Sequence, residues 1–241
     1  MQTIFLISGF PFLLGILLFW CFRHSQKPFL VPMLCALPTA ALAAYASSNP
    51  IPGNEGPGLL AMMFVCLTLG TLAAWMLLRF LPKGDGLLRS PALYLVLYLL
   101  GLFCSCGLLG MTVTVLLGGA EGTALVLTGL LFLFYGAAGY LLPAYAQPRD
   151  RRILAAVLAV CSLGFAALLY ISVTADLFTL YFLIVPYIAA AQTMFPGFFS
   201  TPQSAFVRNV LQPLLISAAP LLMMGGFALG LFLRRHNSRK E

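Results

Sequence analysis

Residues 91–117 read PALYLVLYLLGLFCSCGLLGMTVTVLL and contain no charged side chain. An α-helix rises 1.5 Å per residue, so about 20 apolar residues cross the ~30 Å hydrocarbon core of a bilayer. The run is long enough for this, and it lacks the alternation of apolar and polar residues that is typical of membrane β-strands. Because backbone groups in lipid must bond within their own segment, the run predicts a transmembrane helix.

The composition of the whole chain agrees with this interpretation. Of its 241 residues, 61% are hydrophobic and 8% are charged, whereas a soluble domain carries about 25% charged residues. Seven more apolar runs cover residues 4–22, 28–45, 59–80, 123–145, 153–171, 177–195 and 210–233. The sequence therefore predicts an all-α polytopic transmembrane helix bundle of eight spans, in which residues 1–241 form a single integral membrane domain with no soluble domain.

The basic residues of the loops predict the orientation, because Lys and Arg near span ends stay in the cytoplasm. They lie in odd-numbered loops: Arg23 and Lys27 in the first, Lys83 and Arg89 in the third, and Arg149, Arg151 and Arg152 in the fifth. The second and fourth loops hold only Glu55 and Glu121 as charged residues. The amino terminus is therefore expected outside.

The last third of the chain allows two topologies. Eight crossings leave nine basic residues inside and four outside. If the segment around 177–197 enters the membrane and returns without crossing, twelve basic residues are inside and only Arg208 is outside. Charge favours seven spans plus this re-entrant segment, and run length favours eight. In both cases the net charge of +7 is an orientation signal, so no nucleic-acid partner is expected.

The spans lack the groups that most membrane mechanisms need. Every charged residue lies in a loop or within about one turn of a span end. This argues against ion coupling through a buried carboxylate and against a voltage sensor. The two histidines, His24 and His236, lie in basic loops, and no His-Glu-x-x-His motif is present. No metal site, cofactor or catalytic residue is therefore expected, and an enzyme is the less favoured class.

Residues 176–208 contain the most unusual segment, which reads DLFTLYFLIVPYIAAAQTMFPGFFSTPQSAFVR. Broken helices with exposed backbone groups are tolerated in a membrane only against protein or a water-filled cavity, and transporters bind ligands there. We therefore expect Pro186, Tyr187, Gln192 and Thr193 to form a ligand-binding site. The alternative is a kinked span that is followed by an aromatic loop at the interface, which needs no ligand.

The leading functional hypothesis is a transport or binding component for a small neutral, zwitterionic or lipid-like molecule. The expected partners are the lipid bilayer and, for a subunit of a complex, other membrane subunits. A non-catalytic membrane scaffold or assembly partner is the alternative. A membrane-embedded enzyme acting on lipid is third, with Glu121, Asp176 and Arg208 as its polar candidates near the surface. The absence of an Asn-x-Ser/Thr sequon is consistent with a bacterial cytoplasmic (inner) membrane.

Two further patterns concern packing. Gly136 with Gly139, and Gly225-Gly226 with Gly230, are spaced so that small residues let helix backbones approach closely. The tyrosines, several of which lie near predicted span ends, fit the aromatic belts of a membrane interface.

Overall fold

The computed structural model describes residues 5–22, 29–48, 56–80, 90–117, 122–143, 148, 150–174, 181–199 and 204–237, and every regular element in these ranges is helical. The contacts divide the chain into two compact units, Met1–Ser90 and Pro91–Glu241. Each unit is described by itself, and the single membrane domain over residues 1–241 stays a prediction.

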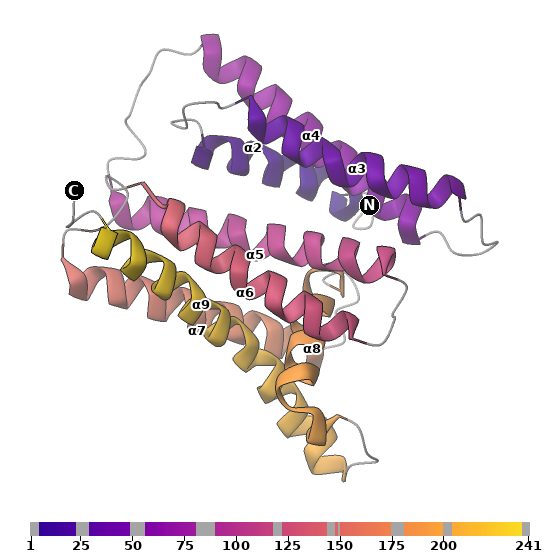
Figure 1. The fold of residues 1–241 in the computed structure, drawn as a ribbon, viewed down its shortest axis with the longest axis vertical. Helices are drawn as coiled ribbons and strands as arrows, with labels where there is room; N and C mark the ends of the chain where they lie inside the picture. The colour runs from indigo at the N-terminus through magenta and orange to yellow at the C-terminus, as the bar shows by residue number, and fades with distance from the viewer. Residues whose placement is uncertain are drawn as a thin grey trace. The chain divides into compact units, whose positions relative to one another are not determined.

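The first unit contains a π-helical turn, η1 (Phe5–Gly9), and helices α2 (Phe10–Phe22), α3 (Leu30–Ser48) and α4 (Gly56–Phe80). Helix α3 packs on α4 and runs opposite to it, whereas α2 and α4 run in the same direction (Figure 1). The backbones of α2 and α4 meet at two glycines. A Cβ on Gly15 would come closer than 3.0 Å to the Leu67 carbonyl, and one on Gly70 would come as close to the Phe12 carbonyl. Small residues permit this approach in lipid.

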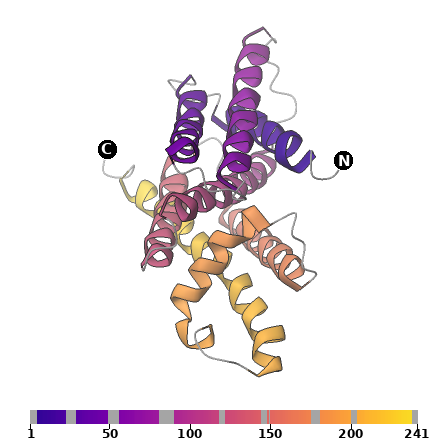
Figure 2. The same ribbon diagram turned by 90° about the vertical axis from the view of Figure 1, so that its right-hand side faces the viewer.

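The second unit contains α5 (Pro91–Leu116), α6 (Thr123–Leu141), α7 (Arg151–Thr174), α8 (Tyr181–Met194) and α9 (Gln212–Asn237). A short 3₁₀ helix, η4 (Pro196–Phe198), follows α8, and a π-helical turn, η5 (Val207–Leu211), leads into α9. Helix α8 packs on α5 and α6, and its end forms with the first turns of α9 a hairpin that extends beyond these helices (Figures 1 and 2). We call this pair of segments the α8–α9 hairpin.

Helices α6 and α9 run in the same direction. A Cβ on Gly226 would contact Phe132, and one on Gly230 would come closer than 3.0 Å to the Gly136 carbonyl. A step from Gly226 to Gly230 along α9 thus corresponds to a step from Phe132 to Gly136 along α6, as expected for parallel helices. Gly139 meets the Phe227 carbonyl in the same interface. The predicted role of these glycines in close packing is confirmed for Gly136, Gly139, Gly226 and Gly230, whereas a Cβ on Gly225 would meet nothing within 4 Å.

Each of the eight predicted runs contains a helix, and the predicted all-helical membrane class is confirmed to that extent. Among the described residues, five helical stretches are long and apolar enough to cross a membrane: Gly56–Leu77, Pro91–Leu116, Thr123–Leu141, Arg151–Thr174 and Val207–His236. The other three apolar helices are shorter, namely Ile7–Phe22, Leu30–Tyr45 and Ile184–Met194. With 14 residues, α8 is about 21 Å long, which is less than the thickness of the hydrocarbon core.

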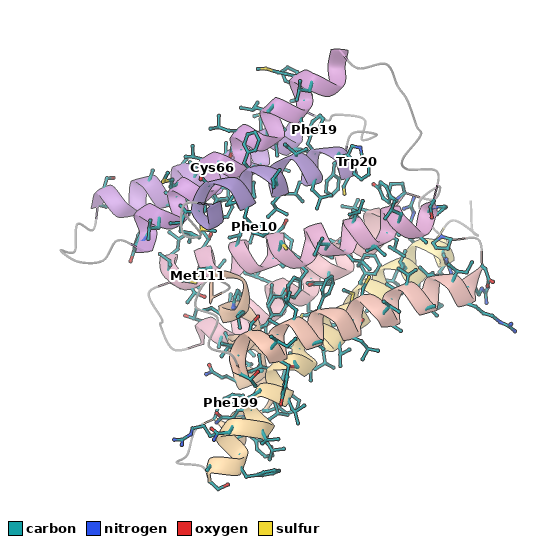
Figure 3. The ribbon with its side chains drawn as sticks, turned by 180° about the vertical axis from the view of Figure 1, so that it is seen from behind. Phe10, Phe19, Trp20, Cys66, Met111 and Phe199 are labelled. Atoms are coloured by element: carbon teal, nitrogen blue, oxygen red, sulfur yellow. The ribbon has the colours of Figure 1, made fainter. Side chains whose placement is uncertain are left out.

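The surface of the helices is apolar. Leu133, Val160 and Phe232 are 67%, 68% and 65% exposed, and the side chains along the helices are almost wholly carbon (Figure 3). Water would not accommodate so many exposed large apolar side chains. Contact with the acyl chains of a bilayer explains them.

Candidate ligand site at helix α8

Pro186 fixes the position of α8 in the second unit. It lies inside the helix, where its ring removes one backbone donor and disturbs the hydrogen-bond ladder. The ring packs on Gly110 of α5, so closely that a Cβ on Gly110 would come closer than 3.0 Å to it. Leu127 of α6 lies next to the same place. The helix is continuous through Pro186, and at this residue it is held between two long helices.

Tyr187, the next residue, is fully buried. Its ring stacks on Phe103 of α5, with centroids 4.9 Å apart and planes at 17°. Phe103 stacks in turn on Phe165 of α7, at 4.4 Å and 12°. Three rings from three helices therefore form one stack, an arrangement of the kind that stabilises aromatic pairs beyond their buried area.

The Tyr187 hydroxyl group is fully used by the protein. It donates a hydrogen bond to the Phe103 carbonyl oxygen at 3.1 Å. The Tyr135 hydroxyl of α6, which is also fully buried, lies 2.9 Å from it. Because Tyr187 donates to Phe103, Tyr135 donates to Tyr187, and both protons are satisfied. We call Phe103, Tyr135, Phe165 and Tyr187 the aromatic core.

The contacts also show where α8 meets α5. The ring of Pro186, at the centre of α8, lies against Gly110 in the second half of α5, and the side chain of Tyr187 reaches back to Phe103 near the middle of that helix. Only six residues of α8 precede Tyr187 and seven follow it, which is about 10 Å on either side.

Gln192 and Thr193 lie elsewhere on α8. Gln192 is exposed, because five residues of α-helix turn the chain by about 140° away from Tyr187. Thr193 is half-buried, and its hydroxyl donates to the Ala189 carbonyl at 2.9 Å. The structure therefore brings Pro186 and Tyr187 together in the core and leaves Gln192 on the surface near the end of the helix.

The turn after α8 is tied back to α9. The Gln212 side-chain amide donates from Nε2 to the Phe198 carbonyl at 2.8 Å, across the α8–α9 hairpin. Phe199, next to this bond, lies at the same turn (Figure 3). Arg208 is exposed in η5, and its N–H donates to the Ser204 carbonyl at 3.1 Å. Glu121 and Asp176, the other two surface candidates, lie outside the described residues.

The sequence did not identify most of the partners of Tyr187. The aromatic-belt interpretation is wrong for four tyrosines, which are at most 4% exposed: Tyr94, Tyr98, Tyr135 and Tyr187. They can be buried because their hydroxyls find acceptors inside the unit, as when Tyr98 donates to the Ala138 carbonyl at 3.1 Å. The usable signal was the position of Tyr135 near the centre of its run, far from either interface.

No group of three or more His, Cys, Asp or Glu side chains in the described ranges could hold a metal ion. The polar atoms of the aromatic core are neutral hydroxyl and carbonyl groups. These groups bind one another, so the aromatic core positions α8 and contributes no charge.

The fold defines an integral, multi-pass helical membrane protein whose apolar helices contact the lipid bilayer. No protein-family model, curated protein or solved structure matches the chain.

Proposed function

We propose that the chain is a membrane component that binds or moves a small neutral, zwitterionic or lipid-like molecule at helix α8. The observation that carries this proposal is the combination of a short helix with a proline inside it, its anchoring in the aromatic core, and an exposed amide near its end. A proline inside a helix leaves one backbone carbonyl of the preceding turn without its donor, and a ligand can use such a group at membrane depth.

We further propose the topology with seven crossings and a re-entrant α8, in a bacterial cytoplasmic membrane. The parallel direction of α6 and α9 supports it. After α6, helix α7 runs back across the membrane, and α9 then runs the same way as α6. This order requires that α8 return to the side from which it entered. Its length of about 21 Å fits a segment that does not cross.

The charges support the same topology. Twelve of the 13 basic residues then lie inside, as the positive-inside rule demands. Arg208 lies outside, on the side that also receives Glu121 and Asp176. The three surface candidates, one cation and two carboxylates, are then assigned to the same side of the membrane.

A cysteine at position 238 tests the topology. In a variant without the native cysteines, Ser238→Cys is expected to resist a membrane-impermeant maleimide in intact cells or right-side-out vesicles, and to react after permeabilisation. Ser90→Cys serves as the inside reference and Asn54→Cys as the outside reference. Labelling of Ser238→Cys from outside, at the rate of Asn54→Cys, would eliminate the seven-crossing topology.

Within this proposal the four candidate residues have two roles. Pro186 and Tyr187 position α8, because both are buried against other helices. Gln192 and Thr193 are the residues offered to a ligand, because the amide of Gln192 is exposed and Thr193 is next to it. An amide presents both a donor and acceptors without a charge, which matches a neutral or zwitterionic molecule.

Removing this amide tests the ligand site. The full chain is purified in mild detergent, and mass spectrometry identifies the small molecules and lipids that co-purify. Gln192→Leu is expected to lower the occupancy of the molecule that co-purifies with the wild-type protein roughly tenfold. This corresponds to the loss of about 1.4 kcal/mol of hydrogen-bond free energy. Thr193→Val is expected to lower it less.

Thr128→Val is the matched control for Thr193→Val. The Thr128 hydroxyl is half-buried too and donates to a carbonyl of its own helix, that of Ala124, at 2.7 Å. Equal occupancy in the wild-type protein and in Gln192→Leu would refute the proposed site, and stoichiometric protein partners without a ligand would support the scaffold alternative.

A further inference from the structure

Gly110 of α5 makes room for the proline of α8. A Cβ on Gly110 would lie 2.5 Å from the Cβ and 2.6 Å from the Cγ of Pro186, and 3.2 Å from the Cδ1 of Leu127 on α6. The pyrrolidine ring cannot turn aside as a flexible side chain does, because it is closed onto the backbone. Leu127 is 1% exposed, so α6 leaves no room either. A side chain at position 110 must therefore displace the backbone of α8.

Helix α8 has a second contact on the same face of α5. The hydroxyl group of Tyr187 donates to the Phe103 carbonyl, and the two rings stack. Phe103 precedes Gly110 by seven residues, which is almost two full turns, so the two contact points share a face of α5 and lie about 10 Å apart along it. Two separate points restrict both the position of α8 and its direction on α5.

The position of α8 decides where its exposed amide lies. Pro186 and Gln192 belong to one continuous helix, Tyr181–Met194, and the six residues from one to the other correspond to about 9 Å along the axis. Such a helix carries a displacement at Pro186 to its last turn. The exposed Gln192 and its neighbour Thr193 therefore take their place from the contact at Gly110.

We propose that Gly110 is the positioning residue of the ligand site at α8. It acts through Pro186, and even alanine at position 110 would disturb the site, because the added Cβ already meets the proline ring. The effect on ligand binding rests on the proposed function, whereas the placement of α8 by Gly110 does not.

The test follows the reactivity of a cysteine at position 192. In the full chain without the native cysteines, purified in mild detergent, Gln192→Cys is labelled with a water-soluble maleimide. Adding Gly110→Ala is expected to change the labelling rate about threefold or more, because overpacking shifts the backbone of α8. Adding Gly129→Ala, the matched control on α6, is expected to leave the rate unchanged, since a Cβ there would meet nothing within 4 Å.

A size-swapped pair tests whether the effect passes through Pro186. Glycine is needed at position 186, because the Cβ that alanine would keep lies 2.5 Å from the added one. G110A/P186G is expected to restore the labelling rate at position 192. If Gly110→Ala lowered the melting temperature and left the rate unchanged, its role would be purely structural and the inference would be overturned. If Gly110→Ala does not fold, recovery of both folding and the labelling rate in G110A/P186G supports the inference, and failure of either contradicts it.

Ligand binding is measured separately in the chain that keeps Gln192. Gly110→Ala is expected to lower the occupancy of the co-purifying molecule about fivefold, which corresponds to about 1 kcal/mol. A changed labelling rate with unchanged occupancy would uphold the placement of α8 by Gly110 and refute the proposed ligand site.

Discussion

Replacing Gly230 by leucine is expected to leave almost no folded protein in mild detergent. A Cβ alone at this position would already come closer than 3.0 Å to the Gly136 carbonyl and to the Tyr140 backbone N. Neither is the end of a flexible side chain, so α6 and α9 must separate. The cost is at least about 3 kcal/mol, the upper end for an overpacked core. Size-exclusion chromatography should show loss of the monodisperse peak.

Gly225→Leu is the matched control, because a Cβ on Gly225 meets nothing within 4 Å and the residue lies on the same helix. It changes helix propensity and hydrophobicity as Gly230→Leu does, and it is expected to keep the wild-type elution profile and melting temperature. If both variants behaved alike, the close crossing of α6 and α9 would be wrong, and with it the main support for a re-entrant α8.

Replacing Tyr187 by alanine should have the second large effect. The change removes a fully buried ring from the stack on Phe103 and leaves the Tyr135 hydroxyl without its acceptor. Truncation of a large buried aromatic side chain costs about 3–5 kcal/mol. We expect a correspondingly lower midpoint when the detergent-solubilised protein is unfolded by added sodium dodecyl sulfate, with the helix content followed by circular dichroism.

Two comparisons separate the ring from the hydroxyl group. Tyr187→Phe keeps the stack, and its coupling with Tyr135→Phe in a double-mutant cycle is expected to be about 0.6–1.7 kcal/mol, the range for hydrogen bonds inside membranes. Tyr140→Ala, at an exposed position on α6, is expected to change the midpoint little. If Tyr187→Ala were as stable as Tyr140→Ala, the proposed contribution of the aromatic core to stability would be wrong.

The sequence predicts where the helices lie, because the apolar runs are long and the charges fall between them. It does not predict how far α8 extends. The run at 177–195 has no charged residue and is long enough for a span, and hydropathy measures transfer into lipid without measuring direction. The arrangement of α8 and α9 comes from packing: Pro186 rests on Gly110, and α9 follows α6 in direction. Neither contact has a signature in the sequence near residue 186.

The sequence predicted the residues of the candidate site but not their partners. Hydroxyl and amide groups on an apolar helix indicate functional polarity, and this pattern identified Tyr187 and Gln192 together. The hydroxyl of Tyr187, however, is bound by a carbonyl that lies 84 residues earlier in the chain. A single sequence carries no information about such a partner. Gln192 remains the exposed member of the set.

The parallel pairing of α6 and α9 also constrains the order in which the protein can be assembled during synthesis. Neighbouring helices can insert as antiparallel hairpins as soon as both have left the ribosome, but the glycine face of α6 must wait for Gly226 and Gly230. Until then Gly136 and Gly139 stand open to lipid or to a chaperone. Helix α9, which is made after α5 to α8, thus completes the packing of the second unit, and such long-range contacts form slowly.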